Sequence, residues 1–262
     1  MKTIKVIFFD VDGTLLSFDT HRVPQSAVEA LWQVHRSGIR IIIATGRAHT
    51  DLHAIADLPY DGVAAFNGAE CVLRDGTPIA RKPIGLDDFL ALQALAHEHG
   101  FPLALETDKG VLVDAVNPDV VKLAELVAHP VPKVADLEKE FRKGEYCQLC
   151  IYCDEAAEKK IMAQLPGLSA SRWNPLFADI NVVGVDKSVG VKTFCTHYGL
   201  DVSQAMAFGD GGNDIPMLQA AGTGIAMGGA SETVKAAADY VTGTVDENGI
   251  RDALLRFNII VG

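Results

Sequence analysis

The sequence predicts an α/β protein in which a parallel-sheet core carries an inserted α+β domain. The chain has 262 residues, which exceeds the usual size of a single domain. In both terminal thirds, short apolar runs alternate with helical patterns, as is typical of βαβ units around a parallel sheet. The middle third instead combines helices with strands whose apolar and polar residues alternate, which favours an antiparallel sheet.

The pattern of the two terminal thirds assigns residues 1–80 and 186–262 to the core. In the first segment we expect strands and one helix, which begins at Pro24, followed by a small hairpin. These elements are strands 5–9, 39–44 and 62–66, helix 24–37, and hairpin strands 70–73 and 77–80. In the last segment we expect helix 188–198, strand 205–208, a helix after Asp214, a short strand near Ile225, a helix from Ser231 and a final helix near Arg251.

Residues 81–185 form the inserted domain in this interpretation. Helices are expected at 86–99 and 119–128. The sheet of this domain should contain four antiparallel strands. These strands are 102–106, 111–116, 146–153 and 177–183.

Composition and charge limit the function. The 23 Lys and Arg against 34 Asp and Glu give a formal charge of −11, which opposes binding of nucleic acid. A small phosphorylated metabolite remains a suitable partner if a metal ion and a few basic residues reverse the potential locally. The apolar runs are too short to cross a bilayer, and no secretory leader is recognisable. We therefore expect a cytoplasmic protein that does not bind a membrane. The sequence names no protein partner.

Three of the five cysteines, Cys147, Cys150 and Cys153, have a spacing that could suit a metal site. They lie in an expected strand, where Cys150 would face away from the other two. We therefore interpret them as small buried apolar residues. His49 and His53 have the spacing of a zinc pair on one face of a possible helix, and we interpret that face as solvated.

The first chemical motif, Asp10 to Leu16, follows the first strand. Ligands bind at the carboxyl edge of open parallel sheets. Asp10 and Asp12 can point into one crevice from this edge, and Gly13 permits the sharp turn that follows. Two adjacent carboxylates repel each other, so the pair suggests a divalent cation or a shared proton. Mg²⁺ fits oxygen ligands of this kind.

Two further segments offer groups that bind phosphate. Thr45, Gly46 and Arg47 follow the second expected strand and supply a hydroxyl, an unhindered amide and a guanidinium. On chemistry alone, Arg47 fits a structural ion pair and a phosphate contact equally well. Lys187, at the start of the helix after the inserted domain, can neutralise charge on a phosphoryl group.

The last motif, Gly209 to Asp214, follows the strand at 205–208 and precedes a helix. Asp210 and Asp214 should therefore reach the same sheet edge as the first motif. The segment 222–228 comes near a dinucleotide-binding loop but misplaces its third glycine, so we expect a short strand between turns there.

These four motifs, in this order and spacing, resemble the haloacid dehalogenase-like hydrolase superfamily. The Asn67-Gly68-Ala69 segment and the insertion before Lys187 are similar to its Cof-type sugar-phosphatase branch, which has a Rossmann-like core and a type IIB cap. The resemblance covers nearly the whole chain. It implies a Mg²⁺-dependent phosphatase in which Asp10 is the nucleophile, forming an aspartyl phosphate, and Asp12 is the general acid and base.

The resemblance also implies which groups hold the ligands. Mg²⁺ would contact the Asp10 carboxylate, the Asp12 main-chain carbonyl and Asp210, with Asp214 ligating through water or orienting Lys187. The phosphoryl oxygens would be held by Thr45, Gly46, Lys187 and Asn213.

In the cap, Ser171 to Phe177 resembles the substrate-facing region of sugar phosphatases, and Arg172 could bind hydroxyls or a second phosphate. Hexose phosphates or related sugar phosphates are the substrates that the resemblance implies. Two alternatives use the same fold: a phosphosugar mutase, and a phosphosugar-binding regulator without turnover. We do not favour the regulator, because the chain has all four residues that the family uses for the reaction: Asp10, Asp12, Lys187 and Asp210.

Overall fold

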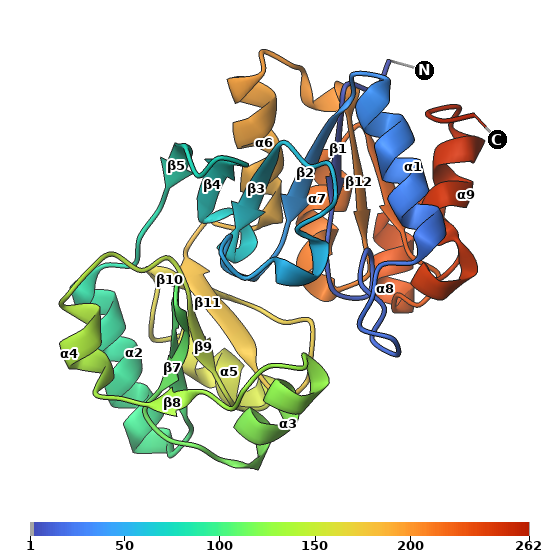
Figure 1. Ribbon diagram of the computed structural model, residues 1–262. Coiled ribbons are helices and arrows are strands. Elements are labelled where there is room, and N and C mark those ends of the chain that lie inside the picture. Colours follow the sequence, from blue (N-terminus) through green and yellow to red (C-terminus); the bar gives the residue numbers. More distant parts are fainter. Residues whose placement is uncertain (1–2, 262) are drawn as a thin grey trace. The chain divides into compact units, whose positions relative to one another are not determined.

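The computed structural model describes residues 3–261, and the chain divides into two compact units (Figure 1). The core unit combines the residues up to Ala80 with those from Asp186 onward. The cap unit spans Arg81–Val185. Within the described range, the longest helices fall short of the length and apolar character needed to cross a membrane.

The core unit contains an eight-stranded sheet of order β14-β13-β12-β1-β2-β3-β4-β5. The strands from β14 to β3 run parallel, and β4 turns back antiparallel to β3. This arrangement confirms the predicted parallel-sheet core. The strands are β1 (Val6–Phe9), β2 (Arg40–Ala44), β3 (Gly62–Ala65), β4 (Glu70–Leu73), β5 (Pro78–Arg81), β12 (Ala205–Gly209), β13 (Thr223–Ala226) and β14 (Tyr240–Val241).

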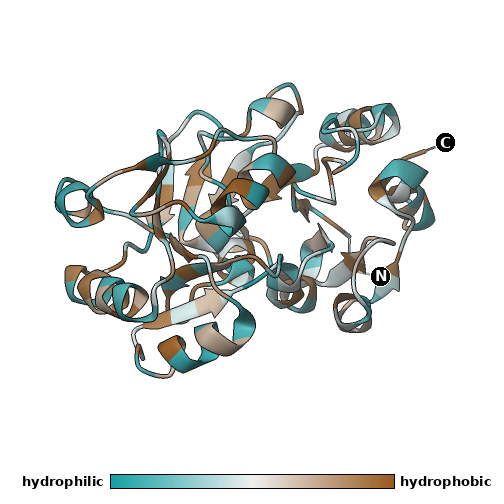
Figure 2. Ribbon diagram, turned by 90° about the horizontal axis from the view of Figure 1, so that it is seen from below, coloured by the Kyte–Doolittle hydropathy of each residue, from teal (hydrophilic) through white to brown (hydrophobic). Residues whose placement is uncertain are grey.

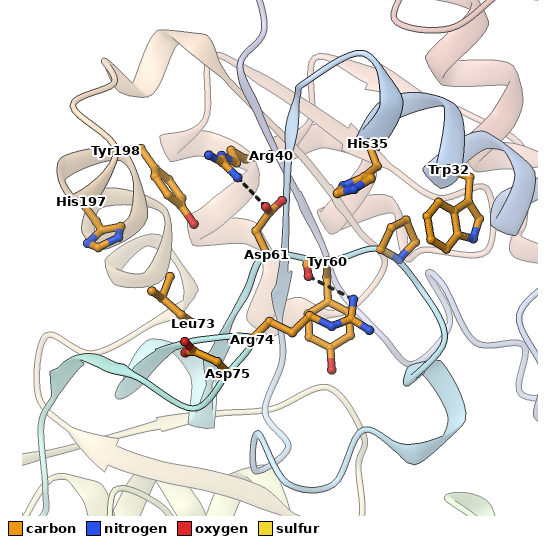
Figure 3. Close-up of a pocket in the computed structure, with 11 residues that line it drawn as sticks. Trp32, His35, Arg40, Tyr60, Asp61, Leu73, Arg74, Asp75, His197 and Tyr198 are labelled. Carbon is orange, nitrogen blue, oxygen red and sulfur yellow. Dashed lines mark hydrogen bonds and ion pairs between the residues drawn. The ribbon is translucent and has the colours of Figure 1, made fainter.

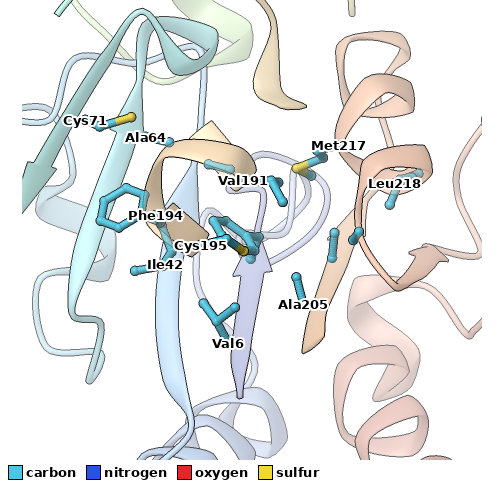
Figure 4. Packing of buried hydrophobic residues seen from close by; sticks show 14 of the residues in the cluster. Val6, Ile42, Ala64, Cys71, Val191, Phe194, Cys195, Ala205, Met217 and Leu218 are labelled. Carbon is cyan, nitrogen blue, oxygen red and sulfur yellow. The ribbon is translucent and has the colours of Figure 1, made fainter. Parts of the chain in front are cut away.

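Helices cover both faces of this sheet because its strands are apolar on both sides. Val6 and Phe8 of β1 pack with side chains of α6, α7 and α8, and Figure 4 shows part of this cluster. The alternate residues of β1 face the other way, toward the side on which Figure 1 places α1 and α9. The helices are α1 (Gln25–Arg36), α6 (Lys187–His197), α7 (Ile215–Ala220), α8 (Glu232–Ala237) and α9 (Gly249–Arg256).

Helix α6 lies unusually close to the sheet. The side chain of Asp186 caps its first turn by accepting a hydrogen bond from the Ser188 amide at 2.8 Å. One turn later, Gly190 lies against β3, where a Cβ added to it would be 2.5 Å from the Cβ of Ala64. The missing side chain therefore lets the first turn of α6, including Lys187, approach the sheet.

The cap unit contains a six-stranded sheet of order β10-β11-β9-β6-β7-β8. All pairs are antiparallel as predicted except β7 with β8, which is parallel. The strands are β6 (Leu103–Thr107), β7 (Gly110–Val113), β8 (Lys133–Val134), β9 (Leu149–Ile151), β10 (Leu168–Ser171) and β11 (Ala178–Val182), and the helices are α2 (Leu86–His99), α3 (Pro118–Leu126), α4 (Leu137–Phe141) and α5 (Glu155–Met162).

Each face of the cap sheet has its own apolar cluster. On one face, Phe89 of α2 stacks on Phe141 of α4, with ring centroids 4.1 Å apart, and both pack with strand residues such as Leu103. On the other face, Tyr152 and Phe177 belong to a smaller cluster. Figure 2 shows that the helices carry both hydrophobic and hydrophilic residues, as expected where only one side of a helix packs.

Some predicted elements differ from the structure. The strand expected at 146–153 is shorter in the structure, where β9 spans only Leu149–Ile151. Beyond its end, Asp154 accepts a hydrogen bond from the Ala157 amide and begins α5. The short elements α4, α5, β8 and β10 were not predicted. No helix contains both His49 and His53, since His49 lies in a turn and His53 begins the short 3₁₀ helix η1 (His53–Ile55). The short strand expected near Ile225 is confirmed as β13.

Of the three cysteines interpreted as buried apolar residues, Cys147 and Cys150 are buried and Cys153 is half-buried. None of the five cysteines, all of which lie in the described residues, forms a disulfide bond, and four of them are buried. Cys150 donates toward Glu106 and Asp179 on neighbouring strands, whereas Cys147 accepts a hydrogen bond from Arg81. Among the described residues, no candidate metal cluster contains a cysteine.

Replacing Gly190 by Ala should destabilise the core unit by about 1–3 kcal/mol, because the new methyl group would overlap Ala64. Intrinsic helix propensity alone predicts the opposite sign, a gain of about 1 kcal/mol. The measurement is urea unfolding followed by Trp32 fluorescence in a Trp173→Phe background, where Trp32 is the only tryptophan left of two.

Gly229→Ala is the matched control, because a Cβ there meets nothing within 4 Å, and its effect should stay below about 1 kcal/mol. Adding Ala64→Gly to Gly190→Ala should restore part of the lost stability. Equal effects of Gly190→Ala and Gly229→Ala would contradict the proposed close approach.

Candidate active site

Three neighbouring strands of the core sheet end at the predicted site. Asp10 follows β1, Thr45 follows β2 and Asp210 follows β12, and these strands are adjacent and parallel. The main-chain amide of Asp10 donates to the carbonyl of Phe208 in β12 at 3.0 Å, which continues the ladder up to the site. The four segments singled out in the sequence therefore meet at the carboxyl edge, with Lys187 supplied by the first turn of α6.

Lys187 connects two of the predicted carboxylates. Its ammonium nitrogen lies 2.6 Å from Oδ1 of Asp10 and 2.5 Å from Oδ1 of Asp214, and all three side chains are at least 90% buried. Burial lowers the pKa of Lys187, but the charges of Asp10 and Asp214 outweigh it and raise the pKa above its ordinary value. The two short contacts therefore favour the charged form of the Lys187 ammonium group inside the protein.

Asp214 orients Lys187 directly, which was one of the two roles considered for it. Its second oxygen, Oδ2, accepts hydrogen bonds from the main-chain amides of Asp210 at 3.0 Å and Gly211 at 2.8 Å. The same carboxylate thus shapes the loop after β12 and fixes the ammonium group. A carboxylate with three donors has little remaining capacity for other partners.

The site contains more acidic side chains than the single ammonium group of Lys187 can neutralise. One carboxylate oxygen from each of Asp10, Asp210 and Asp214 lies within 4.8 Å of the others. Burial and the charge of Asp214 raise the pKa of Asp10 well above its usual range, and the same two causes raise the pKa of Asp210 to about 7. Three carboxylates and one ammonium carry a formal charge of −2, which one divalent cation would balance.

Gly13 is required by the geometry of the first motif. Its φ of +87° is a conformation that side chains rarely adopt. A Cβ at this position would also lie 2.3 Å from Oδ2 of Asp210. Next to it, the hydroxyl of Thr14 donates to Oδ1 of Asp210 at 2.9 Å and orients that carboxylate. No role for Thr14 was predicted from the sequence.

Asp12 has a different environment from the acidic cluster. Its two carboxylate oxygens accept from the Nε and Nη2 atoms of Arg47, at 2.8 Å and 2.7 Å. A second carboxylate, that of Asp51, lies 3.6 Å from Nη1 of Arg47. Two roles were considered for Arg47, and the structure shows the first of them, an ion pair. The second, a contact with the substrate phosphate, stays a prediction.

The loops after β2 and β3 support each other. Asn67 donates its main-chain amide to the carbonyl of Thr45 at 2.9 Å, and its side-chain oxygen accepts from the amide nitrogen of Asn213 at 3.0 Å. Phe66, Asn67 and Gly68 have consecutive positive φ values of 50°, 54° and 89°. Such backbone costs roughly 1–3 kcal/mol at each residue other than glycine and occurs preferentially at functional sites.

Asn67 is thus a site residue for which no role was predicted from the sequence. The Asn67-Gly68 pair after an apolar strand is a turn signal that indicates a left-handed backbone. Thr45 itself is buried, and its hydroxyl oxygen accepts a hydrogen bond from the amide of Arg47 at 3.1 Å, a bond that does not use the hydroxyl proton. Gly46 lies between these two residues in the loop.

Arg172 of the cap has a structural environment that its sequence context did not predict. Its guanidinium forms an ion pair with Glu158 at 2.7 Å and donates to three main-chain carbonyls of the cap. These contacts join α5 to the loop that follows β10. The predicted contact with substrate hydroxyls or phosphate stays a prediction.

A pocket of about 600 Å³ lies elsewhere on the core unit (Figure 3). Arg40, at the start of β2, forms an ion pair there with Asp61 at 2.7 Å, and the rings of Tyr60 and Tyr198 line the wall. Arg40 is at the amino end of β2, whereas Thr45 follows its carboxyl end. This pocket is therefore separate from the acidic site.

Comparison with known proteins agrees with this geometry. The model of a haloacid dehalogenase-like hydrolase family matches residues 7–254. A solved phosphatase of that enzyme superfamily from Bacteroides thetaiotaomicron is 56% identical, with a TM-score of 0.94 over 98% of this chain and 96% of its own. A solved subclass IIB sugar phosphatase is 37% identical, with a TM-score of 0.91 over 98% and 100% of the two chains.

A relative from Bacillus subtilis (strain 168), named "Putative phosphatase YkrA", is 31% identical over 98% of both chains. Because the family model spans nearly the whole sequence, the chain belongs to the haloacid dehalogenase-like hydrolases, in the Cof-type branch, and is a phosphatase.

Removing the positive charge of Lys187 should strongly destabilise the core unit. Lys187→Met leaves Asp10 and Asp214 buried without their partner, and we expect a loss of about 3–5 kcal/mol in the free energy of unfolding. The measurement is again urea unfolding followed by Trp32 fluorescence in the Trp173→Phe background.

Lys192→Met on the same helix is the matched control, because Lys192 is exposed and donates a hydrogen bond of 3.3 Å to the hydroxyl of Ser188. Its effect should be within about 0.5 kcal/mol. Similar losses in the two variants would show that Lys187 is not the interaction that holds the segments together.

Proposed function

We propose that this phosphatase hydrolyses small phosphate monoesters, most favourably sugar phosphates such as hexose phosphates, with Mg²⁺ as cofactor and Asp10 as nucleophile. The observation that carries the proposal is the buried Asp10 carboxylate at the end of β1, bound to Lys187 and surrounded by further carboxylates. A carboxylate is a weak nucleophile toward an anionic ester unless nearby positive charge neutralises the phosphoryl group. Lys187 is placed to supply part of that charge.

The residues present fit a divalent cation. The oxygen atoms of Asp10 and Asp210 and the main-chain carbonyl of Asp12 would hold it, and Asp214, which already binds Lys187, would act through water or through Lys187. The formal charge of −2 on the buried cluster supports a divalent ion. When bound, the cation supplies positive charge that reduces repulsion between the nucleophile and the phosphoryl oxygens.

In the proposed reaction, an oxygen of Asp10 forms a bond to phosphorus as the bond from phosphorus to the ester oxygen breaks. Asp12 gives its proton to the departing alcohol, and the resulting carboxylate then removes a proton from the water that hydrolyses the aspartyl phosphate. Thr45, Gly46, Lys187 and Asn213 would hold the phosphoryl oxygens. The acidic site and its polar loops support this assignment.

The substrate class rests on similarity. The relative with 37% identity is named a sugar phosphatase, and both chains are covered almost completely by the comparison. A phosphosugar mutase or a binding protein without turnover would use the same fold. A mutase would give isomerised substrate without net release of phosphate. A binding protein would bind the phosphosugar without any reaction.

In a phosphate-release screen over phosphorylated metabolites with Mg²⁺, we expect hexose phosphates to give the highest kcat/KM. Asp10→Asn should lower the rate for every ester by at least about 1,000-fold, because the covalent route is removed. Asp57→Asn, an exposed aspartate of the same unit, should behave as wild type. Phosphate release that survives Asp10→Asn would contradict the nucleophile, and a preference for nucleotides would contradict the substrate class.

Mg²⁺ should also stabilise the folded protein in the absence of substrate. At a concentration 100 times the dissociation constant, binding to the native state adds about 2.7 kcal/mol, which a thermal unfolding midpoint detects. Asp210→Asn should lose most of this shift because a ligand is removed, whereas Asp57→Asn should retain it. An equal shift in both variants would indicate that Mg²⁺ binds elsewhere.

A further inference from the structure

The ion pair between Asp12 and Arg47 is the best-defined contact of the site that the proposed reaction does not yet use. Both carboxylate oxygens of Asp12 are bound, by Nε at 2.8 Å and by Nη2 at 2.7 Å. The side chains of Arg47 and Asp12 are only 15% and 18% exposed. Two parallel hydrogen bonds fix both the position and the plane of a carboxylate, which a single contact does not.

The backbone around Arg47 is also held at both ends. Its amide donates to the hydroxyl of Thr45 at 3.1 Å, and its carbonyl accepts from the amide of Phe66 at 3.1 Å. Phe66 begins the left-handed segment that supports Asn67. The loop after β2 therefore presents the guanidinium from a fixed base to a carboxylate in the loop after β1.

The position of Asp12 matters for proton transfer to the departing ester oxygen. A carboxyl group that two hydrogen bonds hold in one place and one plane is already aligned for that transfer. This benefit should grow with the basicity of the departing oxygen, because a more basic oxygen depends more on receiving the proton.

We propose that Arg47 is a positioning residue that orients Asp12 for proton transfer to the leaving group, rather than a contact to the substrate phosphate. The inference rests on the proposed function, in which Asp12 is the general acid. It distinguishes Arg47 from Thr45, Lys187 and Asn213, which are assigned to the phosphoryl group. Loss of a phosphate contact should slow all esters alike, whereas loss of an oriented acid should slow mainly the esters with basic leaving groups.

The test measures kcat/KM with saturating Mg²⁺ for three esters of increasing leaving-group basicity: p-nitrophenyl phosphate, phenyl phosphate and a hexose 6-phosphate. For Arg47→Gln we expect a loss of about 10- to 100-fold with the hexose phosphate and less than about threefold with p-nitrophenyl phosphate. Phenyl phosphate should give an intermediate loss. Arg47→Lys should recover part of the activity, because a single ammonium holds one oxygen but not the plane.

Arg40→Gln is the matched control, because Arg40 forms an ion pair with Asp61 at the opposite end of β2 (Figure 3). It should leave the relative rates of the three esters unchanged. Circular dichroism and the unfolding midpoint identify any variant that is misfolded, and Arg47→Lys keeps the charge balance if Arg47→Gln is unstable.

A double-mutant cycle completes the experiment. In an Asp12→Asn background, Arg47→Gln should cause no further leaving-group-dependent loss, because the group that it positions is already absent. Equal losses for all three esters, or the same selective loss in the Asp12→Asn background, would overturn the inference while leaving the proposed function intact. A wild-type protein that releases no phosphate from any of the esters would overturn the proposed function and the inference with it.

Discussion

The buried contact of Lys187 with Asp10 and Asp214 is the interaction on which the site depends. It joins the end of β1 to the start of α6 across 177 residues of sequence, and the start of α6 to the loop after β12. Burying these charges is costly, and only their mutual attraction and hydrogen bonds offset the cost. The close packing of Gly190 on Ala64 is the steric condition that brings this turn of α6 to the sheet.

The electrostatics of the site separate into two parts. Asp12 and Arg47 form a neutral pair with matched geometry, whereas the cluster around Lys187 keeps an excess of negative charge. Burial, and next to it the charge of Asp214, raises the pKa values of Asp10 and Asp210. In the proposed reaction, a divalent cation balances the negative charge of the cluster around Lys187, and Asp12 of the ion pair transfers the proton. In that proposal, nucleophilic attack and acid catalysis use two neighbouring groups of charges at one sheet edge, and the charge of Asp12 still acts on Asp10.

Much of this arrangement follows from the sequence, because a parallel sheet aligns its carboxyl ends and places Asp10, Thr45 and Asp210 together. The partners that long side chains choose cannot be predicted from the sequence in this way. Arg47 reaches a partner 35 residues away, and Arg172 uses its donors within the cap, although neither choice has a local pattern. The left-handed backbone at Phe66 was unpredictable for a bulky residue, and the short cap elements α4 and α5 lack enough periodicity to detect.

The central claim is that Asp10 carries the phosphoryl group between the ester and water. The stereochemical course at phosphorus tests it most directly: a thiophosphate ester made chiral at phosphorus by one oxygen isotope is hydrolysed in water that carries a third oxygen isotope, and the configuration of the product thiophosphate is determined. Two successive in-line displacements, first by Asp10 and then by water, predict net retention of configuration. Net inversion would mean a single direct attack by water and would contradict the account.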